Sequence, residues 1–233
     1  MKDDMPGNRL FTDEQLKDLG RRNVDAIAEA IDSGDLDQAK DLAQRMHREC
    51  LAMHDGLIAW ITATLTFVGR HYGDEALAVA LREGCTAWLQ PLSERFAHAD
   101  VGHRVVMMTK MLRGHMMPIR IEEDDEKFTF VMEPCGSGGR LVLDGKYGPP
   151  SNFLKIAKPQ PLTCGQKDFP VYCAHAAVLA MLGMEWSGAP LFFEEPSDKV
   201  GEKPCKMYLY KDPKATPAEL YAKVGKKKSN PGS

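Results

Sequence analysis

The feature that most constrains the fold is a change in hydrophobic spacing near residue 118. Before it, apolar residues recur every three or four positions, which is the spacing of amphipathic helices. After it come runs rich in β-branched and aromatic residues, at 127–133, 140–143, 190–193 and 206–210, which are typical of strands. The sequence therefore predicts an α+β fold, in which an N-terminal helical half packs on a small antiparallel sheet with one or two further helices.

This division gives three expected regions. Residues 1–118 form the helical half, and residues 119–215 form an α+β half with a Cys/Gly-rich hairpin. We expect one site between these two halves. Residues 216–233 are expected to hold a short helix and a disordered basic tail.

Local signals place the helix ends. Thr12 and Gln15 have the spacing of a capping box, which predicts a helix that continues to about residue 32. Gly73 and Pro91 are expected to interrupt the later helices. The acidic run 121–127 is interpreted as a solvated edge, because its spacing does not match a calcium-binding loop.

Composition narrows the classes of function. The 233 residues carry a net charge of −3, which does not indicate a nucleic-acid groove or a surface for anionic membranes. The longest apolar run, 57–69, is too short to span a bilayer, and the first residues lack the apolar core of a signal peptide. Six cysteines do not make a disulfide-dense scaffold. We therefore expect a cytoplasmic protein with reduced thiols and neither a nucleic-acid nor a membrane partner.

A histidine-bearing stripe is the first candidate for chemistry. His47, Cys50 and His54 fall on one helical face, in line with the apolar residues that follow them. If this stripe faces inward, the ring nitrogens of the two histidines need hydrogen-bond partners or ligands. These are each other, a ligand or a metal in a functional site, or backbone groups and water if the histidines are ordinary core residues. Asp55 lies on the flank of this face, where it can orient His54, bind substrate or be solvated.

The turn after residue 134 is the second candidate. Gly136, Ser137, Gly138 and Gly139 follow Cys135, and Arg140 closes the turn. Three of these four positions lack a Cβ, so that a substrate can approach the backbone closely. The turn amides are suited to an oxyanion or carboxylate, and Arg140 to a carboxylate. The alternative is a tight hairpin with a packed thiol.

Cys173 and His175 form the third candidate. Pro170 suits the first position of a helix that runs to about residue 182, which places Cys173 in the first turn. The helix dipole there favours a thiolate, although an inert buried cysteine is the alternative. In a regular helix His175 points away from Cys173, so the two serve one centre only if the helix begins later.

A further histidine and a metal alternative remain. His115 lies where the helical half passes into the sheet half, a junction that favours clefts. If the protein binds a metal, zinc or iron, the expected ligands are Cys135, Cys173, His175 and Cys205. These residues contain no Cys-x2-Cys spacing, and the leading interpretation needs no cofactor.

Four segments carry a family resemblance: MHDGLIAW, EDDEKFTFVMEPCGSGGRL, FPVYCAHAAVL and PCKMYLYKDP. Together they resemble the L-2-amino-thiazoline-4-carboxylic acid hydrolase-like family over about residues 46–215. This resemblance implies hydrolytic opening of a carbon–nitrogen bond in a small heterocycle. Helices followed by a small sheet that ends in a Cys-x-aromatic strand also resemble the 4-vinyl-reductase type of ligand-binding domain.

The sequence thus leads to a hydrolase hypothesis. The substrate is a small, carboxylated compound that contains nitrogen or sulfur. Cys135 or Cys173 is the nucleophile, and His115, His54 or His175 is the general acid and base. We expect His54 and His115 to face the two cysteines across one cleft. The alternative is a metal- or ligand-binding domain without turnover. Substrate and oligomeric state stay open, and a homo-oligomer is compatible with the sequence.

Overall fold

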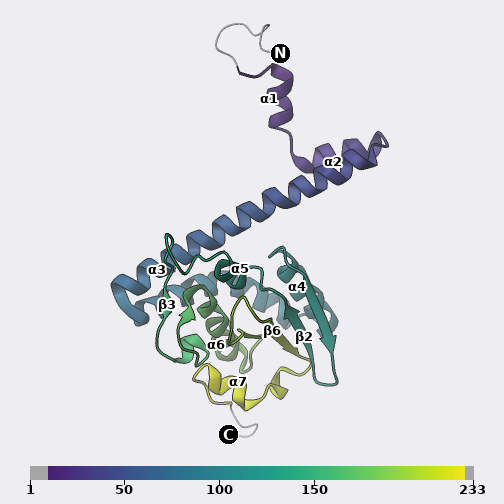
Figure 1. The fold of residues 1–233 in the computed structure, drawn as a ribbon. Helices are drawn as coiled ribbons and strands as arrows, with labels where there is room; N and C mark the ends of the chain where they lie inside the picture. Colours follow the sequence, from purple (N-terminus) through teal and green to yellow (C-terminus); the bar gives the residue numbers. More distant parts are fainter. Residues whose placement is uncertain (1–9, 229–233) are drawn as a thin grey trace. The chain divides into compact units, whose positions relative to one another are not determined.

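The computed structural model describes residues 10–228 (Figure 1). Its internal contacts form two compact units that divide between His54 and Asp55. The long helix α3, Leu36–Ala97, belongs to both units. The expected change from helices to strands near residue 118 coincides with the gap between α4, Val101–Arg113, and β1, Ile119–Glu123.

The first unit contains α1, Asp13–Leu19, α2, Asn23–Asp32, and the start of α3. The capping box is confirmed: the Thr12 hydroxyl accepts the Gln15 amide N–H, and the Gln15 side chain accepts the Thr12 amide N–H. The expected single helix to residue 32 is wrong, because the chain forms two helices instead.

Helix α3 tests the two expected interruptions. Gly73 has a φ of 83° inside the helix, so the break expected there is confirmed. Pro91 does not break the helix, which continues to Ala97. A proline removes one backbone donor, and here the surrounding packing tolerates that loss, with Leu89 and Phe96 on either side fully buried.

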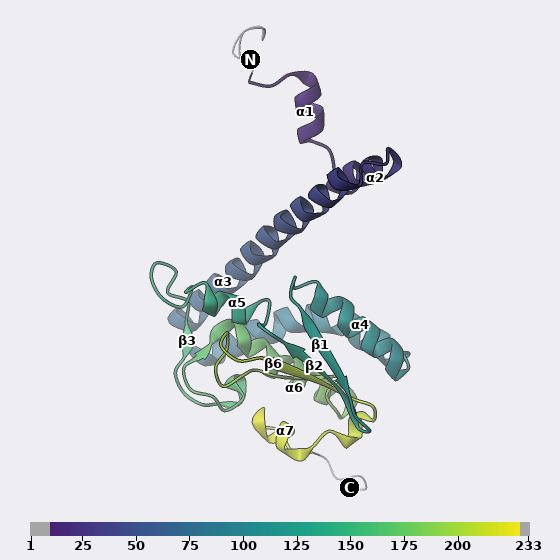
Figure 2. The same ribbon diagram turned by 45° about the vertical axis from the view of Figure 1, so that its right-hand side comes forward.

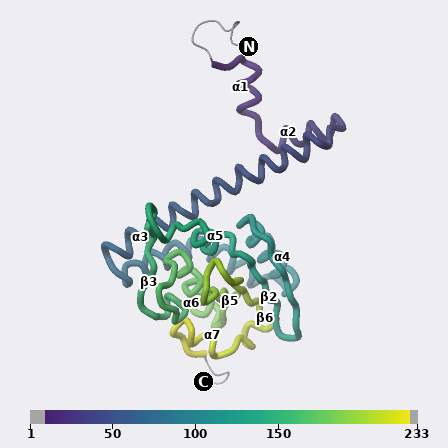
Figure 3. Tube along the Cα trace, viewed as in Figure 1, coloured from purple at the N-terminus to yellow at the C-terminus, as the bar shows by residue number. Residues whose placement is uncertain are grey.

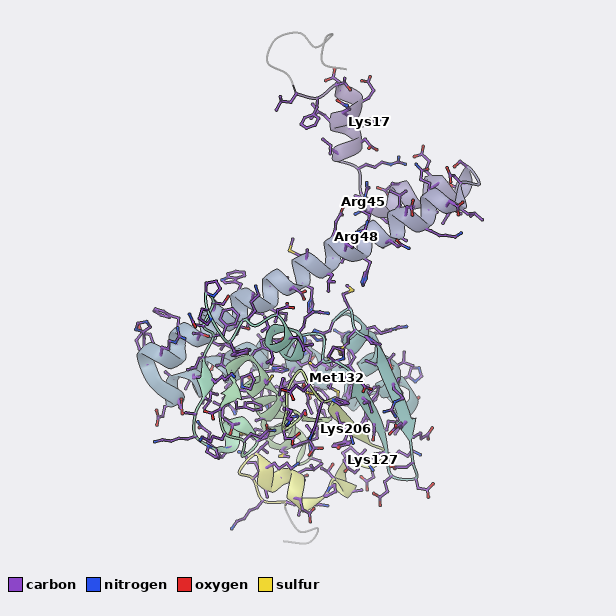
Figure 4. All side chains as sticks on the ribbon, viewed as in Figure 1. Lys17, Arg45, Arg48, Lys127, Met132 and Lys206 are labelled. Carbon is purple, nitrogen blue, oxygen red and sulfur yellow. The ribbon has the colours of Figure 1, made fainter. Side chains whose placement is uncertain are left out.

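A four-stranded antiparallel sheet forms the centre of the second unit (Figure 2). Its order is β1, β2 (Lys127–Met132), β6 (Cys205–Tyr210) and β5 (Phe193–Glu195). This confirms the α+β class. Figure 4 labels Lys127 and Met132 at the two ends of β2 and Lys206 on the neighbouring β6. Strand β1 was not expected, because its acidic residues face solvent and hide the pairing of its backbone with β2.

The segment after β2 does not form the expected second strand. Residues 138–143 form a short helix, α5, Gly138–Leu143, so the hairpin prediction is wrong. The chain turns because the Cys135 carbonyl accepts the Arg140 amide N–H and the Ser137 carbonyl accepts the Leu141 amide N–H. A Cβ on Gly138 would collide with the Cys173 sulfur, so glycine is what allows α5 to lie against Cys173.

The Pro170 helix start is also wrong. Pro170 ends β4, Phe169–Pro170, which pairs with β3, Lys155–Ile156. A 3₁₀ turn, Val171–Ala174, follows, and α6 begins only at His175 and runs to Ser187. Two further 3₁₀ turns, Pro161–Thr163 and Pro213–Ala215, complete the loops.

The last helix, α7, spans Ala218–Lys223, which confirms the short helix expected after residue 216. It lies beside α6, as the tube in Figure 3 shows, and Leu220 and Tyr221 pack in one cluster with Ala177 and Ala180 of α6. Most of the expected basic tail, 229–233, lies outside the described residues.

The two faces of the sheet have different neighbours. Met207 and Leu209 of β6 pack in the larger core cluster, which includes side chains of α3 and α4 such as Leu81 and Met108. Residues on the opposite face, such as Tyr210, pack against α7.

Helix α3 is also long and apolar enough to cross a membrane, judged by length and composition. Within its most apolar stretch, 22 % of the residues are buried.

Candidate functional site

Two of the cavities in the second unit are lined by residues that the sequence suggested as site residues. The larger has a volume of about 560 Å³ and is lined by α3, the end of α4, the start of α6, β5 and β6. Its polar side chains are few and include His115, Tyr172, His175 and Glu194. The lining therefore draws on residues from both sides of position 118.

The sheet register explains how a carboxylate reaches this cavity. Glu194 of β5 pairs directly with Met207 of β6, and cross-strand partners point to the same face. Cys205 lies two residues before Met207 and shares that face, because side chains alternate along a strand. Glu194 and Cys205 therefore both point toward the larger core cluster.

His175 is the ionic partner of Glu194. The Nε2 atom of His175 lies 3.4 Å from Oε2 of Glu194, and its Nδ1 atom lies 2.6 Å from the Tyr172 carbonyl oxygen. Burial lowers the pKa of His175, but the charge and hydrogen bond of Glu194 outweigh burial and raise it to about 9. Burial raises the pKa of Glu194, but His175 outweighs it, so the net direction is down. The two residues therefore form an ion pair at neutral pH.

Cys135 has an environment that stabilises a thiolate. The Cys205 thiol, the Ser137 hydroxyl and the Gly139 amide are hydrogen-bonded to its sulfur, and the Ser137 oxygen lies at 3.5 Å. The bond from Cys205 lowers the pKa of Cys135 most. Burial and the Glu194 charge oppose it, and the resulting pKa is about 6. Hydrogen bonds to the charged form of a group favour ionisation in this way.

The pKa values of the neighbouring thiols, Cys173 and Cys205, shift upward. Burial raises the pKa of Cys173 well above its usual value, which overturns the expectation that a helix start activates it. The position explains the difference, because Cys173 lies in the 3₁₀ turn before α6 and is 6 % exposed. The bond to Cys135, followed by burial, raises the pKa of Cys205.

Cys173 and His175 do come into one neighbourhood, because α6 begins later than expected. The charge on Cys135 acts on both of them. Cys135 also interacts with Cys205, so three of the residues suggested as metal ligands interact with the fourth, Cys135. Within residues 10–228, no group of three or more His, Cys, Asp or Glu side chains is arranged to hold a metal ion.

The smaller cavity, of about 220 Å³, has Ser137 in its lining. It is lined by charged side chains, Asp55, Arg140, Asp144 and Lys146, together with Ser137 and residues of α3. Ser137 therefore lines this cavity and contacts the Cys135 sulfur. Its hydroxyl is also hydrogen-bonded to Tyr172, a residue of the larger cavity.

Arg140 holds the turn to its surroundings. Its Nε donates to Oδ1 of Asp55 at 3.0 Å, and its terminal nitrogen donates to the carbonyl oxygens of His115, at 2.9 Å, and Gly136. These bonds join α3, the end of α4 and the turn. The guanidinium expected to clamp a carboxylate is thus engaged by protein acceptors.

The turn amides are engaged as well. The Gly136 amide donates to the Met117 sulfur at 2.9 Å, and the Gly139 amide is directed at the Cys135 sulfur. A Cβ on Gly136 would collide with the His115 carbonyl oxygen. The close approach that these glycines permit is therefore to the protein's own backbone and sulfur atoms.

The histidines expected in the helical half differ in where the structure places them. His115 lines the larger cavity and its charge acts on Glu194. His54 ends the first unit, whereas both cysteines belong to the second. His47 and Cys50 are exposed, so the expectation of an inward face is wrong there. Further along the same stripe Leu57 and Ile61 are exposed as well, and Leu65 is its first buried member.

Sequence reasoning missed Glu194. The run 190–193 was expected to be a strand, but β5 begins at Phe193 and includes Glu194. Strand alternation places Phe192 and Glu194 on the same side, and both line the larger cavity. The signal in the sequence was a carboxylate, Glu194, two residues after the buried Phe192, because this spacing places both side chains on the same face of a strand.

The chain was compared with protein-family models, curated proteins and solved structures. None of the three comparisons finds a match.

Proposed function

We propose that the protein is a cysteine-dependent hydrolase that opens a carbon–nitrogen bond in a small nitrogen- or sulfur-containing compound. The observation that carries this proposal is the surroundings of the buried Cys135 sulfur: the Cys205 thiol, the Ser137 hydroxyl and the Gly139 amide lower its pKa, whereas the pKa values of the neighbouring thiols are raised. A thiolate is the nucleophilic form of cysteine, and the lowered pKa of Cys135 favours that form.

The His175–Glu194 pair supplies the proton in this proposal. The Cys135 sulfur forms a bond to the substrate carbon, the carbon–nitrogen bond breaks, and the leaving nitrogen takes a proton from His175. Neutral His175 then removes a proton from water, whose oxygen bonds to the same carbon, and the carbon–sulfur bond breaks to restore the thiolate. Glu194 keeps His175 oriented and stabilises its charged form.

The substrate must reach the buried sulfur of Cys135 through one of the two cavities. Cys135 is 7 % exposed and is not part of the lining of either cavity; Ser137, which contacts its sulfur, lines the smaller cavity, and His175, on which its charge acts, lines the larger. The larger cavity contains the proton donor, so we assign the substrate to that cavity. His115 lines it too, which keeps this residue as a second candidate acid or base.

The test compares thiol variants in an assay of thiazoline ring opening, with mass spectrometry to detect the addition of one water. Cys135→Ala and Cys135→Ser are expected to lose activity by about 100-fold or more. Cys173→Ser is expected to retain most of it, because its pKa is raised, and Cys50→Ser controls for an exposed thiol. Full activity in both Cys135 variants would refute the thiol mechanism.

A second function is favoured by the size and apolar lining of the larger cavity: ligand binding without turnover. Elemental analysis and ligand-bound mass spectra of the purified protein separate the two. Stoichiometric zinc or iron that is lost in Cys135 or Cys173 variants supports the binding domain. Metal-free protein with an alkylatable Cys135 supports the enzyme.

We retain the cytoplasm as the proposed location. Helix α3 contributes Leu65, Leu77, Leu81 and Leu89 to the core of the second unit, and Gly73 breaks the helix among them. A helix used in this way supports a soluble protein. Fractionation of cells that express the chain tests this.

A further inference from the structure

The larger cavity has the dimensions and walls of a site for an apolar molecule. Its volume of about 560 Å³ falls within the range of small-molecule sites, roughly 300–1,000 Å³. Most of the lining is aliphatic, aromatic or sulfur-containing, and includes Leu81, Met111, Leu179, Phe192 and Met207. Burial of apolar ligand surface against such walls supplies the main binding energy.

The charges of His175 and Glu194 in this cavity neutralise each other, and His115 is a further histidine in the lining. His175 and Glu194 form an ion pair, and among the described lining residues none is Lys or Arg. A carboxylate that entered would lose water and meet the Glu194 charge. An uncharged polar group, by contrast, can hydrogen-bond to the pair without disturbing its charge balance.

Two tryptophans of the cavity lining are also exposed to solvent. Trp60 and Trp88 both line it, yet they are 71 % and 45 % exposed. Contiguous exposed apolar surface is typical of ligand-binding grooves, and flat indole faces pack well against rings. The charged side chains Arg140 and Lys146 line the smaller cavity instead.

From these observations we infer that the larger cavity binds an uncharged, ring-bearing apolar molecule, with its polar group at His175 and Glu194 and its rings toward Trp60 and Trp88. As an assignment of the substrate class, this inference rests on the proposed function. It departs from the carboxylated substrate expected from the sequence. As an assignment of a binding site, it holds with or without turnover.

Two glycines of α3 offer matched variants that fill one cavity each. Gly84 lines the larger cavity and Gly56 lines the smaller, and at neither position would a Cβ meet any atom within 4 Å. Both lie within the same helix, so Gly84→Phe and Gly56→Phe change backbone propensity in the same way. They differ in the cavity that the new ring blocks.

The binding test uses the neutral fluorescent probe N-phenyl-1-naphthylamine with the full-length protein. We expect saturable binding to the wild type, a loss of affinity of about tenfold or more in Gly84→Phe, and unchanged affinity in Gly56→Phe. Absence of binding to the wild type, or an equal effect of the two variants, would overturn the inference. Circular dichroism verifies folding, and Gly84→Leu serves as a second blocking variant.

The charge preference is tested with a matched pair of competitors. Naphthalene-2-carboxamide and 2-naphthoate share ring size and differ in charge, and the carboxamide is expected to displace the probe about tenfold better. Equal or better displacement by the carboxylate would contradict an uncharged ligand.

Cys135→Ala separates this inference from the proposed hydrolase. Probe binding is expected to persist in this variant, whereas ring opening is lost if the thiol mechanism holds. Binding without any loss of turnover would refute the mechanism alone. Turnover lost in Cys135→Ala with no probe binding to the wild type would refute the cavity assignment alone.

Discussion

The Ser137 hydroxyl oxygen lies 3.5 Å from the Cys135 sulfur, and Ser137 also lines the smaller cavity. One side chain therefore connects a thiolate-stabilising environment to a charged pocket. The Cys205 thiol also lowers the pKa of Cys135. Cys205 lies on β6, directly opposite Met132 at the end of β2. The reactivity of Cys135 thus depends on two residues from different elements, and each can be varied alone.

Ser137→Ala is expected to raise the pKa of Cys135, because it removes one donor to the thiolate. The pKa can be followed through the ultraviolet absorbance of the thiolate, taken as the difference between each protein and its Cys135→Ala counterpart. Ser33→Ala, at the C-terminal cap of α2 in the other unit, is the control and leaves the titration unchanged. An unchanged pKa in Ser137→Ala would show that this hydroxyl does not act on the sulfur.

Cys205→Ala is expected to raise the pKa of Cys135 further than Ser137→Ala does, because the bond from Cys205 has the largest effect. The variant also leaves a small void at a side chain that is 3 % exposed, which costs about 1 kcal/mol of unfolding free energy. Cys205→Ser retains a donor and should give an intermediate pKa. The same titration measures all three variants, and a reversed order would contradict this assignment.

The pH dependence of stability contains two opposing contributions. Folded His175 keeps its proton up to a pKa of about 9, above its ordinary value of 6.5, so its stabilisation is complete below pH 6.5 and lost as pH rises to 9. Folded Cys135 has a pKa of about 6, below its ordinary value of 9.0, so its stabilisation is present above pH 9 and lost as pH falls to 6.

Cys135→Ala removes the contribution of Cys135 to the pH dependence of stability, so that the contribution of His175 can be measured alone. In this variant we expect the unfolding free energy, measured in urea, to fall by up to about 3 kcal/mol from pH 6.5 to 9. The wild type should change less over the same range. Adding Glu194→Gln should abolish the fall, because the partner of His175 is then uncharged. A flat profile in Cys135→Ala alone would argue against the ion pair.

The sequence predicted the local features of this fold better than it predicted the contacts between residues that are far apart in the chain. The capping box at Thr12 and the break at Gly73 depend on neighbouring residues, and both were predicted. Residues 138–143 were taken for a strand because Leu141 to Leu143 have strand-like composition. Their helix depends on close packing of Gly138 against Cys173, a contact 35 positions away that no local pattern reveals.

The candidate site shows the same limit. Cys135 and His175 were identified as reactive residue types, yet the pKa of Cys135 depends on Cys205, and that of His175 depends on Glu194. Both partners reach the site through the strand register of β5 and β6. For Cys173 the sequence suggested activation by a helix start, whereas burial by distant elements decides its pKa.

Gly136→Ala tests the packing of the turn. Its Cβ would collide with the backbone oxygen of His115, which cannot rotate away, so we expect a loss of about 2 kcal/mol or more of unfolding free energy. Gly84→Ala is the control, because a Cβ there meets nothing within 4 Å, and it should stabilise by up to about 1 kcal/mol. Urea unfolding measures both. A turn that accepts alanine at Gly136 without loss would be more mobile than the contacts indicate.

Arg140→Lys decides between two roles for this side chain. The guanidinium donates to the Asp55 carboxylate and to the carbonyl oxygens of His115 and Gly136, and a lysine cannot reproduce several donors in one plane. If Arg140 chiefly joins these elements, Arg140→Lys should lower the unfolding free energy by about 2 kcal/mol. Asp55→Asn should cost less, because both carbonyl acceptors remain.

The alternative role is the one that the sequence suggested, a clamp for a substrate carboxylate. In that case Arg140→Lys would unfold like the wild type, while the KM of a carboxylated thiazoline would rise and that of its uncharged amide would not. The bonds of Arg140 predict the opposite: a lower unfolding free energy, with KM changing to a similar degree for both substrates. Urea unfolding together with the two KM values distinguishes these outcomes, because only a carboxylate clamp makes the effect depend on substrate charge.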